Sequence, residues 1–219
     1  MATDDNIRTT RLDDGRTLAW SEYGDPGGTP VLYCHGFPGS RLEAALTAPA
    51  ARALGVRLIA PDRPGFGRSD FRSDRTISEW PADVAKLADA LGLWSFSTLG
   101  VSGGAPYALA CAALLPARVT RLALVAPLGP ADSAAAAAGM AQLNRLFLSI
   151  FRHSPAAGRL LLAPLALGGR LAPQALFALF TATVPATDHS VLARPEIRAL
   201  FVASLAEAFR QGSRGAARE

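Results

Sequence analysis

The sequence predicts an α/β protein: a mostly parallel, doubly wound sheet with a helical cap. Three observations lead to this fold class. Short apolar runs alternate with helical periodicity between residues 30 and 126, as strands and crossover helices do in parallel sheets. Glycine, proline and polar residues cluster directly after these runs, at the strand ends where sites form in such sheets. From residue 130 onward alanine and leucine dominate and prolines punctuate, which indicates several helices.

Six strands are predicted, and the first two form a hairpin. They cover Ile7–Leu12 and Thr17–Tyr23, and Asp13-Asp14-Gly15-Arg16 between them is a turn signal. The later strands are short apolar runs typical of buried parallel strands, at Pro30–Cys34, Val56–Ala60, Phe96–Val101 and Val119–Ala126.

Three helices are predicted between these strands, over Ser40–Ala53, Ser78–Leu91 and Ala105–Leu115. Ser40 and Glu43 have the spacing of a capping box at the start of the first helix. The helices expected after the last strand cover roughly 133–151, 158–167, 173–183 and 194–210. We therefore divide the chain into a core over 1–129 with six strands, a helical cap over 130–210 and a tail over 211–219.

Composition excludes several classes of function. Half of the 219 residues are hydrophobic, which suits a folded domain. Lys86 is the only lysine and the arginines are scattered, so a nucleic-acid partner is not expected. The N-terminus has no apolar leader, and charges and prolines interrupt the most apolar region, 146–167, so no membrane span is predicted. Cys34 and Cys111 lie in apolar segments without metal-ligand spacing, so we expect a cytoplasmic protein with no disulfide, metal or cofactor.

The stretch Gly100-Val101-Ser102-Gly103-Gly104 joins a predicted strand to a predicted helix. A serine with glycine two residues before and two after it is the G-x-S-x-G pattern of a nucleophile elbow. The turn is sharp, and side chains at Gly100 and Gly104 would collide with the neighbouring strand and helix. An ordinary glycine-rich turn between strand and helix is the alternative explanation.

Three motifs in sequence order together resemble the α/β-hydrolase superfamily in its capped, single-domain form, over about residues 7–210. His35–Gly39 is similar to the family's oxyanion loop, Pro61–Asp70 to its D-x-x-G-x-G-x-S segment, and Gly100–Gly104 to its elbow. The resemblance implies a doubly wound sheet of the α/β-hydrolase type.

By this resemblance Ser102 would be the nucleophile, and the backbone N–H groups of Phe37 and Gly103 would form the oxyanion hole. The expected chemistry is acyl transfer through an acyl-enzyme, on a small-molecule substrate that is an apolar ester or a related carbonyl compound. A serine at the elbow argues against the epoxide-hydrolase and dehalogenase branches, which use aspartate there.

Three further residues of these loops are expected to have structural roles. The resemblance assigns His35 to hydrogen bonding within the oxyanion loop. Asp62 and Arg63 are expected to hold their own loop by hydrogen bonds and an ion pair. None of the three is predicted to act directly in catalysis.

A catalytic triad needs an acid and then a histidine after the serine. No strand-like run that could carry them follows Ala126, so we expect a chain truncated at its C-terminus relative to the family. Asp132, His153 and His189 are the remaining candidates, and a structural role in the cap is favoured for each.

Two functions are therefore consistent with the sequence. The first is an esterase-like serine hydrolase whose activity in this chain is weak or absent. The second is a non-catalytic α/β-hydrolase-like fragment or binding module. In both cases the last predicted strand would be an open apolar edge, through which we expect self-association.

Overall fold

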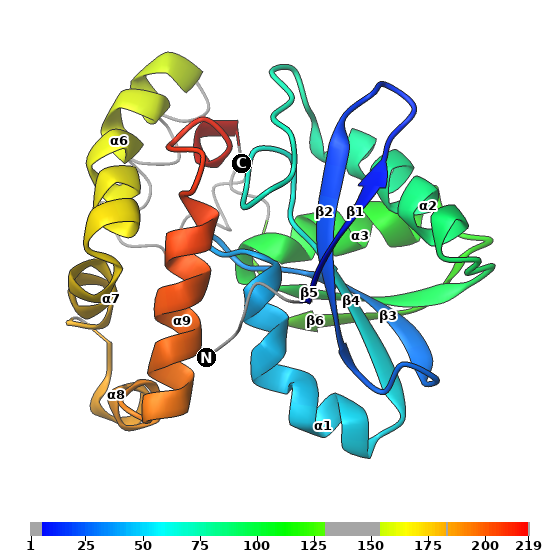
Figure 1. The fold of residues 1–219 in the computed structure, drawn as a ribbon, viewed down its shortest axis with the longest axis horizontal. Coiled ribbons are helices and arrows are strands. Elements are labelled where there is room, and N and C mark those ends of the chain that lie inside the picture. The colour runs from blue at the N-terminus through cyan, green and yellow to red at the C-terminus, as the bar shows by residue number, and fades with distance from the viewer. Residues whose placement is uncertain (1–5, 130–153, 183, 219) are drawn as a thin grey trace.

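The fold is built on one six-stranded sheet with the strand order β1-β2-β4-β3-β5-β6 (Figure 1). The computed structural model describes residues 6–129, 154–182 and 184–218. The β1–β2 and β2–β4 pairs are antiparallel, and the β3–β4, β3–β5 and β5–β6 pairs are parallel. The strands are Ile7–Arg11 (β1), Thr17–Gly24 (β2), Thr29–Cys34 (β3), Val56–Pro61 (β4), Phe96–Val101 (β5) and Val119–Val125 (β6). The predicted α/β fold class is confirmed.

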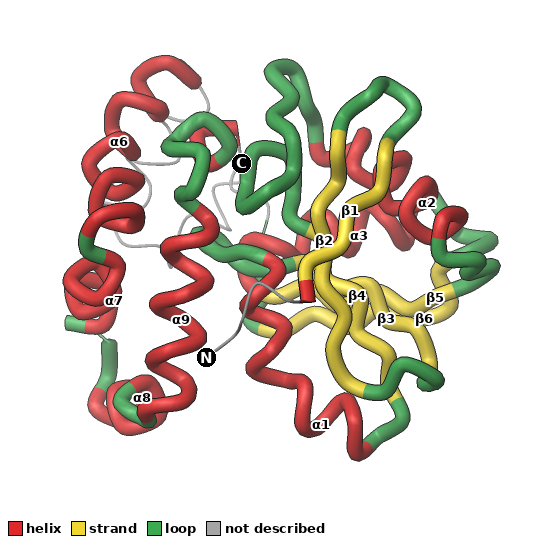
Figure 2. Tube along the Cα trace, viewed as in Figure 1, coloured by secondary structure: helices red, strands yellow, loops and turns green. Residues whose placement is uncertain are grey.

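The helices between the strands lie on both faces of this sheet (Figure 2). α1 (Ala48–Ala53) follows the 3-10 segment η2 (Arg41–Thr47) and packs against β2 and β4. α2 (Trp80–Ala90) and α3 (Ala105–Leu114) pack against each other, and α3 also contacts β5 and β6. In Figure 1 the strands separate α1 from α2 and α3.

Side chains alternate between the two faces of the central strands, because successive residues of a strand point in opposite directions. Leu32 of β3 and Ile59 of β4 belong to a buried cluster with residues of α2 and α3. Their neighbours Tyr33 and Leu58 belong to a second cluster with Ala51 of α1. Burial on both faces explains why these strands are nearly continuous apolar runs in the sequence.

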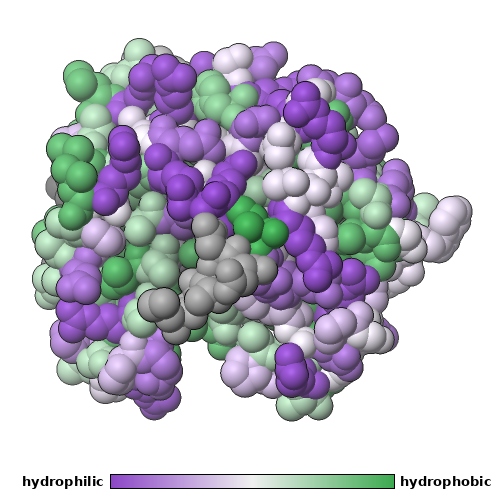
Figure 3. All heavy atoms as spheres, in the orientation of Figure 1, coloured by the Kyte–Doolittle hydropathy of each residue, from purple (hydrophilic) through white to green (hydrophobic). Residues whose placement is uncertain are grey.

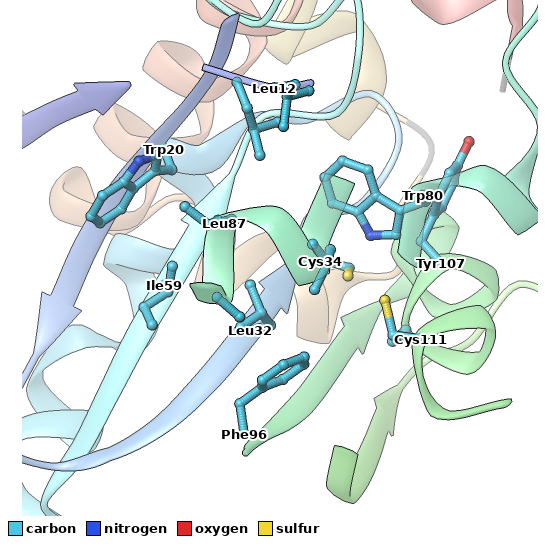
Figure 4. Packing of buried hydrophobic residues seen from close by; sticks show 14 residues of the cluster. Leu12, Trp20, Leu32, Cys34, Ile59, Trp80, Leu87, Phe96, Tyr107 and Cys111 are labelled. Atoms are coloured by element: carbon cyan, nitrogen blue, oxygen red, sulfur yellow. The ribbon is translucent and has the colours of Figure 1, made fainter. Parts of the chain in front are cut away.

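The larger cluster forms the core between the sheet and the pair α2 and α3 (Figure 4). The Trp80 and Tyr107 rings meet edge to face, with centroids 6.1 Å apart and planes at 88°. The residues labelled in Figure 4 are Leu12, Trp20, Leu32, Cys34, Ile59, Trp80, Leu87, Phe96, Tyr107 and Cys111.

The predicted helix over Ser40–Ala53 is wrong in its first half, which is the 3-10 segment η2 rather than α-helix. The predicted capping box is also wrong. The Glu43 carboxylate turns inward and accepts hydrogen bonds from the Tyr33 hydroxyl of β3 and from the Gly36 N–H of the following loop, so it does not reach back to Ser40. A capping box forms instead between Thr76 and Glu79, just before α2.

The described residues beyond the sheet form α6 (Pro155–Leu171), α7 (Pro173–Thr181), α8 (Ala186–Leu192) and α9 (Pro195–Ala208). Three of these match predicted helices, and α8 is an additional one. The helix predicted over 133–151 lies outside the described residues. α6 to α9 lie to one side of the sheet, with α9 nearest to it (Figure 1), and α9 contacts η2.

Exposed leucines mark the outer side of α6 and α7, among them Leu160, Leu171 and Leu179. Apolar residues gather at this edge of the molecule in Figure 3. Within the described ranges, the helices do not combine the length and apolar character needed to cross a bilayer.

β6 lies at one end of the sheet as the structure describes it, and β1 lies at the other. Leu122, Leu124 and Val125 of β6 are exposed in the structure. Self-association through this strand stays a prediction from the sequence.

Replacing Leu87 with alanine should lower the free energy of unfolding by about 2–5 kcal/mol, because it leaves a cavity in the larger cluster. The Leu87 side chain is 0% exposed, whereas Leu54 is 77% exposed. Urea unfolding followed by circular dichroism measures the change. The matched control Leu54→Ala should change stability by less than about 1 kcal/mol; equal losses in the two variants would contradict this description of the core.

Candidate active site

Ser102 lies at the turn between β5 and α3, in the first residue of a short 3-10 segment, Ser102–Gly104. Its φ of +49° lies in the left-handed region, which residues other than glycine rarely adopt. A Cβ atom on Gly104 would lie 2.1 Å from the Cys34 carbonyl oxygen, and one on Gly100 would lie 2.7 Å from the Ala105 Cα. The strand, the turn and the helix therefore pack so closely that neither position admits a side chain.

The loop after β3 lies directly against this turn. A Cβ atom on Gly103 would lie 3.3 Å from the Phe37 nitrogen and 2.8 Å from the Phe37 Cβ. A Cβ atom on Gly36 would lie 3.6 Å from the Ser102 Cβ. The structure thus brings Phe37, Ser102 and Gly103 together at the carboxyl ends of β3 and β5. The Phe37–Pro38 peptide bond in this loop is cis.

His35 is fully buried, and both of its ring nitrogens are engaged. Nδ1 lies 3.0 Å from the Gly36 carbonyl oxygen, and Nε2 lies 3.3 Å from the Arg63 backbone nitrogen. Burial holds the pKa of His35 well below its usual value of 6.5, so the ring is neutral. In the neutral ring Nδ1–H therefore donates to Gly36 and Nε2 accepts from Arg63. This agrees with a structural role for His35.

The Arg63 side chain is buried and donates to the same loop. Its Nη1 donates to the His35 carbonyl oxygen, and its Nη2 donates to the Gly36 carbonyl oxygen at 3.2 Å. The guanidinium carbon lies 4.6 Å from the centre of the Tyr107 ring and 5.3 Å from that of Phe66. One arginine thus connects the loop after β4 to two carbonyls of the loop after β3.

Glu43 holds the opposite side of the loop after β3. The Gly36 N–H donates to both carboxylate oxygens, at 3.0 and 3.1 Å, and the Tyr33 hydroxyl donates to one of them at 2.9 Å. Burial raises the pKa of Glu43 above its usual value of 4.5. The sequence pattern predicted that Glu43 caps a helix, but its carboxylate instead binds the Tyr33 hydroxyl of β3 and the Gly36 N–H of the following loop.

Asp62 is the buried anchor of the loop after β4. Its carboxylate accepts from the Arg41 backbone N–H and from Arg41 Nη1, both at 2.7 Å, and from the Arg68 N–H at 3.1 Å. Burial raises the pKa of Asp62 above 3.8. Asp62 thus holds its own loop as predicted, but its ion pair is with Arg41, and the Arg63 side chain donates to the loop after β3.

α9 is joined to these loops by polar side chains. Ser204 Oγ accepts from the Ser40 N–H at 3.0 Å, and Glu207 forms an ion pair with Arg41. Beyond the helix, Gln211 donates to the Gly67 and Ser69 carbonyl oxygens at 3.0 and 2.7 Å.

Sequence reasoning missed Ser204, Glu207 and Gln211. The spacing of Ser204 and Glu207 would have been the available signal, because it places two polar groups on one face in the apolar second half of α9. Gln211 lies beyond the helix and gives no such signal.

The candidates for an acid and a base do not join this site in the described residues. Asp132 and His153 lie outside the described residues. His189 lies on α8 and is exposed. Cys34 is buried, and burial raises the pKa of its thiol to about 11, so it is a thiol at neutral pH.

Comparison with known proteins agrees with this fold. Residues 29–151 match the family model described as the alpha/beta hydrolase fold. The chain therefore belongs to the α/β-hydrolase fold family.

Individual relatives differ in their named activities. The chain is 38% identical over 116 residues to a dihydrolipoyllysine-residue acetyltransferase component of the acetoin cleaving system of Pseudomonas putida, covering 52% of this chain and 31% of that protein. It is 35% identical over 124 residues to a non-heme chloroperoxidase of Streptomyces lividans, covering 56% of this chain and 45% of that protein. The chain thus spans less than half the length of either relative.

A solved structure shows the same fold. A hydrolase from Pseudomonas aeruginosa PA01 superposes with a TM-score of 0.65, covering 99% of this chain and 72% of that one at 21% sequence identity. At that identity the likeness concerns the fold alone.

The positive φ at Ser102 predicts that substitution by glycine does not lower stability there, as it does in a helix. Ser102→Gly should be as stable as Ser102→Ala or up to about 1 kcal/mol more stable, because glycine adopts this backbone without steric cost. Chemical unfolding of the two variants measures the difference. At the control position Ala82, in α2, glycine should lower stability by about 0.5–1 kcal/mol; a similar loss at position 102 would count against the left-handed turn.

Glu207→Gln should lower the free energy of unfolding by about 1–3 kcal/mol at neutral pH, because Arg41 loses a charged partner. Burial opposes ionisation of Glu207, but hydrogen bonds from Arg41 and Arg210 outweigh it and lower its pKa below 4.5. A carboxyl group whose pKa is lower in the folded than in the unfolded protein stabilises the fold at pH values above the unfolded-state pKa. This stabilisation is lost as the pH falls through the folded-state pKa.

The difference between wild type and Glu207→Gln should therefore shrink as the pH falls below about 4.5. Unfolding curves at a series of pH values test this. The control Glu196→Gln alters an exposed residue of the same helix and should shift stability by less than about 0.5 kcal/mol at every pH. A constant difference for Glu207→Gln across pH would show that the carboxylate charge is not what matters.

Proposed function

We propose that this chain carries the nucleophile and the oxyanion hole of a serine hydrolase that acts by acyl transfer. The observation that carries the proposal is the left-handed φ of +49° at Ser102, in a turn where Gly100 and Gly104 leave no room for side chains. A strained serine at the end of a central strand is typical of a residue held for reaction rather than for packing.

The proposed reaction proceeds in two steps. Ser102 Oγ attacks the carbonyl carbon of an ester and loses its proton, and the carbonyl oxygen becomes an oxyanion. The bond to the leaving alcohol breaks, the alcohol takes up a proton, and an acyl-enzyme remains. Water then adds to the acyl carbon, the acid is released, and Ser102 recovers its proton.

The proposed oxyanion donors are the backbone N–H groups of Gly103 and Phe37. The Gly103 N–H is the second of a helical segment, where N–H groups have no acceptor within the helix. The Phe37 N–H meets no acceptor among the described residues, and the Phe37 nitrogen lies beside Gly103. One well-placed donor contributes about 3 kcal/mol to the transition state.

We propose a small apolar ester or a related carbonyl compound as the substrate. The support is the apolar character of the helices beside the sheet: α7 contains no charged residue, and α6 contains no acidic one. A cationic substrate would need acidic recognition groups that these two helices do not offer, and α7 offers no charged group of either sign.

We further propose that the chain alone has weak activity. His35 belongs to the loop that lies against Ser102, and both of its ring nitrogens are occupied by backbone groups. A serine without a base remains a neutral hydroxyl, and loss of a triad partner costs about 10⁴-fold in kcat. This same observation favours the second candidate function, a binding module that has kept the site without its proton relay.

Incubation with a fluorophosphonate probe should label Ser102 slowly, because the probe's phosphorus–oxygen group can occupy the oxyanion hole while the hydroxyl lacks a base. Intact-protein mass spectrometry follows the adduct over time. Ser102→Ala should abolish labelling.

The matched control Ser97→Ala removes a hydroxyl from the same strand and should label at the wild-type rate. Labelling that persists in Ser102→Ala would sink the assignment of the nucleophile. Labelling within seconds would contradict the proposed weak activity, and no labelling at all would favour the binding module.

A further inference from the structure

Two successive peptide groups of the oxyanion loop are held by side chains. In the first, the His35 carbonyl accepts from Arg63 Nη1 and the Gly36 N–H donates to Glu43 at 3.0 and 3.1 Å. In the second, the Gly36 carbonyl accepts from Arg63 Nη2 at 3.2 Å and from His35 Nδ1 at 3.0 Å. Three of the four hydrogen-bonding groups in these two peptide units are thereby accounted for, and the fourth is the N–H of Phe37.

Fixing the Gly36 carbonyl also fixes the Phe37 N–H, because both belong to one planar peptide group. The group is trans, so the N–H points away from the carbonyl oxygen. Arg63 and His35 pull the oxygen to one side, and the N–H is directed to the other. The Phe37 nitrogen lies next to Gly103, which supplies the second proposed oxyanion donor.

The guanidinium group suits this task because its nitrogens diverge in one rigid plane. Nη1 and Nη2 reach carbonyls of adjacent residues, and the ring of Tyr107 lies 4.6 Å from the guanidinium carbon. A lysine at position 63 could donate to either carbonyl but would not hold both in a fixed relation.

We propose that Arg63 and Glu43 are positioning residues that aim the Phe37 N–H at the oxyanion formed at Ser102. Neither side chain touches the reacting atoms. Each acts through the backbone: Arg63 from the carbonyl side of the loop and Glu43 from the N–H side. This inference rests on the proposed function of Ser102, and it adds two residues for which the sequence indicated other roles.

The test compares Arg63→Lys with Arg75→Lys. Arg75 is a matched control because its guanidinium lies over the same two rings, 5.8 Å from Phe66 and 6.0 Å from Tyr107, but donates to the Gly215 carbonyl. Arg63→Lys should lower the rate constant of fluorophosphonate labelling by about 10–100-fold with full final labelling. Arg75→Lys should stay within about threefold of wild type.

If Arg63 only stabilised the fold, Arg63→Lys would lower the melting temperature and the final labelled fraction, and the labelling rate constant of the folded protein would stay unchanged. Hydrogen–deuterium exchange over residues 35–40 measures how firmly the loop backbone is held, independently of any reaction at Ser102. Exchange should be faster in Arg63→Lys than in Arg75→Lys. A wild-type labelling rate, or unchanged exchange, in folded Arg63→Lys would overturn the proposal. Absence of labelling in the wild-type protein would instead overturn the proposed function, and exchange would still decide the positioning role.

A pair of variants at Glu43 keeps the test open if Arg63→Lys does not fold. Glu43→Gln retains an acceptor for the Gly36 N–H and should label within about threefold of wild type. Glu43→Leu has no acceptor for this N–H, so its labelling rate constant should fall by about tenfold or more, and exchange over residues 35–40 should be faster. Equal rates in the two Glu43 variants would contradict the proposed role of the carboxylate.

Discussion

The close approach of backbone to backbone at Gly104 is the constraint on which the rest of this structure depends. The space for a Cβ atom there is taken by the Cys34 carbonyl oxygen, at 2.1 Å. Only because this side chain is missing can the end of β3 touch the turn after β5. The same contact places the Phe37 loop beside Ser102, so a steric requirement at one glycine determines which groups can share the site.

Buried charge connects this site to the helix α9. Arg41, Asp62 and Glu207 are all buried, and moving such groups out of water is costly unless they find partners. Each finds one: Arg41 lies between the two carboxylates. These buried ion pairs determine the position of α9 more than they add to stability, because any other placement of α9 would leave a buried charge without its partner. The cap helix nearest the sheet is therefore held in one register.

The turn at Ser102, the succession of strands and helices along the chain and the structural role of His35 could be predicted because their causes are local in sequence. Gly100 and Gly104 flank Ser102 directly, and His35 bonds to the next residue along the chain. The partners of Glu43 could not be predicted in this way. A serine followed three residues later by glutamate looks the same whether the carboxylate caps a helix or turns toward a buried loop.

Contacts between residues distant in sequence were beyond such reasoning. Arg41 is adjacent to neither of its carboxylate partners, and Ser204 meets Ser40 across most of the chain. Only the folded topology brings these residues together, since the sequence pattern of each is that of an ordinary exposed polar residue. The proposed positioning role of Arg63 has the same origin, because it depends on which carbonyls lie within reach of the guanidinium.

The seating of α9 has a consequence for how such a chain can diverge. Ser204, Glu207 and Gln211 fix the point at which the polypeptide returns to the loops beside the sheet. The described part of the stretch before that point is tied to the same loops by apolar contacts, because Leu162 and Leu176 share a buried cluster with Phe66. A homologue that replaced this stretch would therefore have to keep the hydrogen bonds of Ser204 and Gln211 and an apolar surface against Phe66, whereas the turn at Ser102 could stay unchanged.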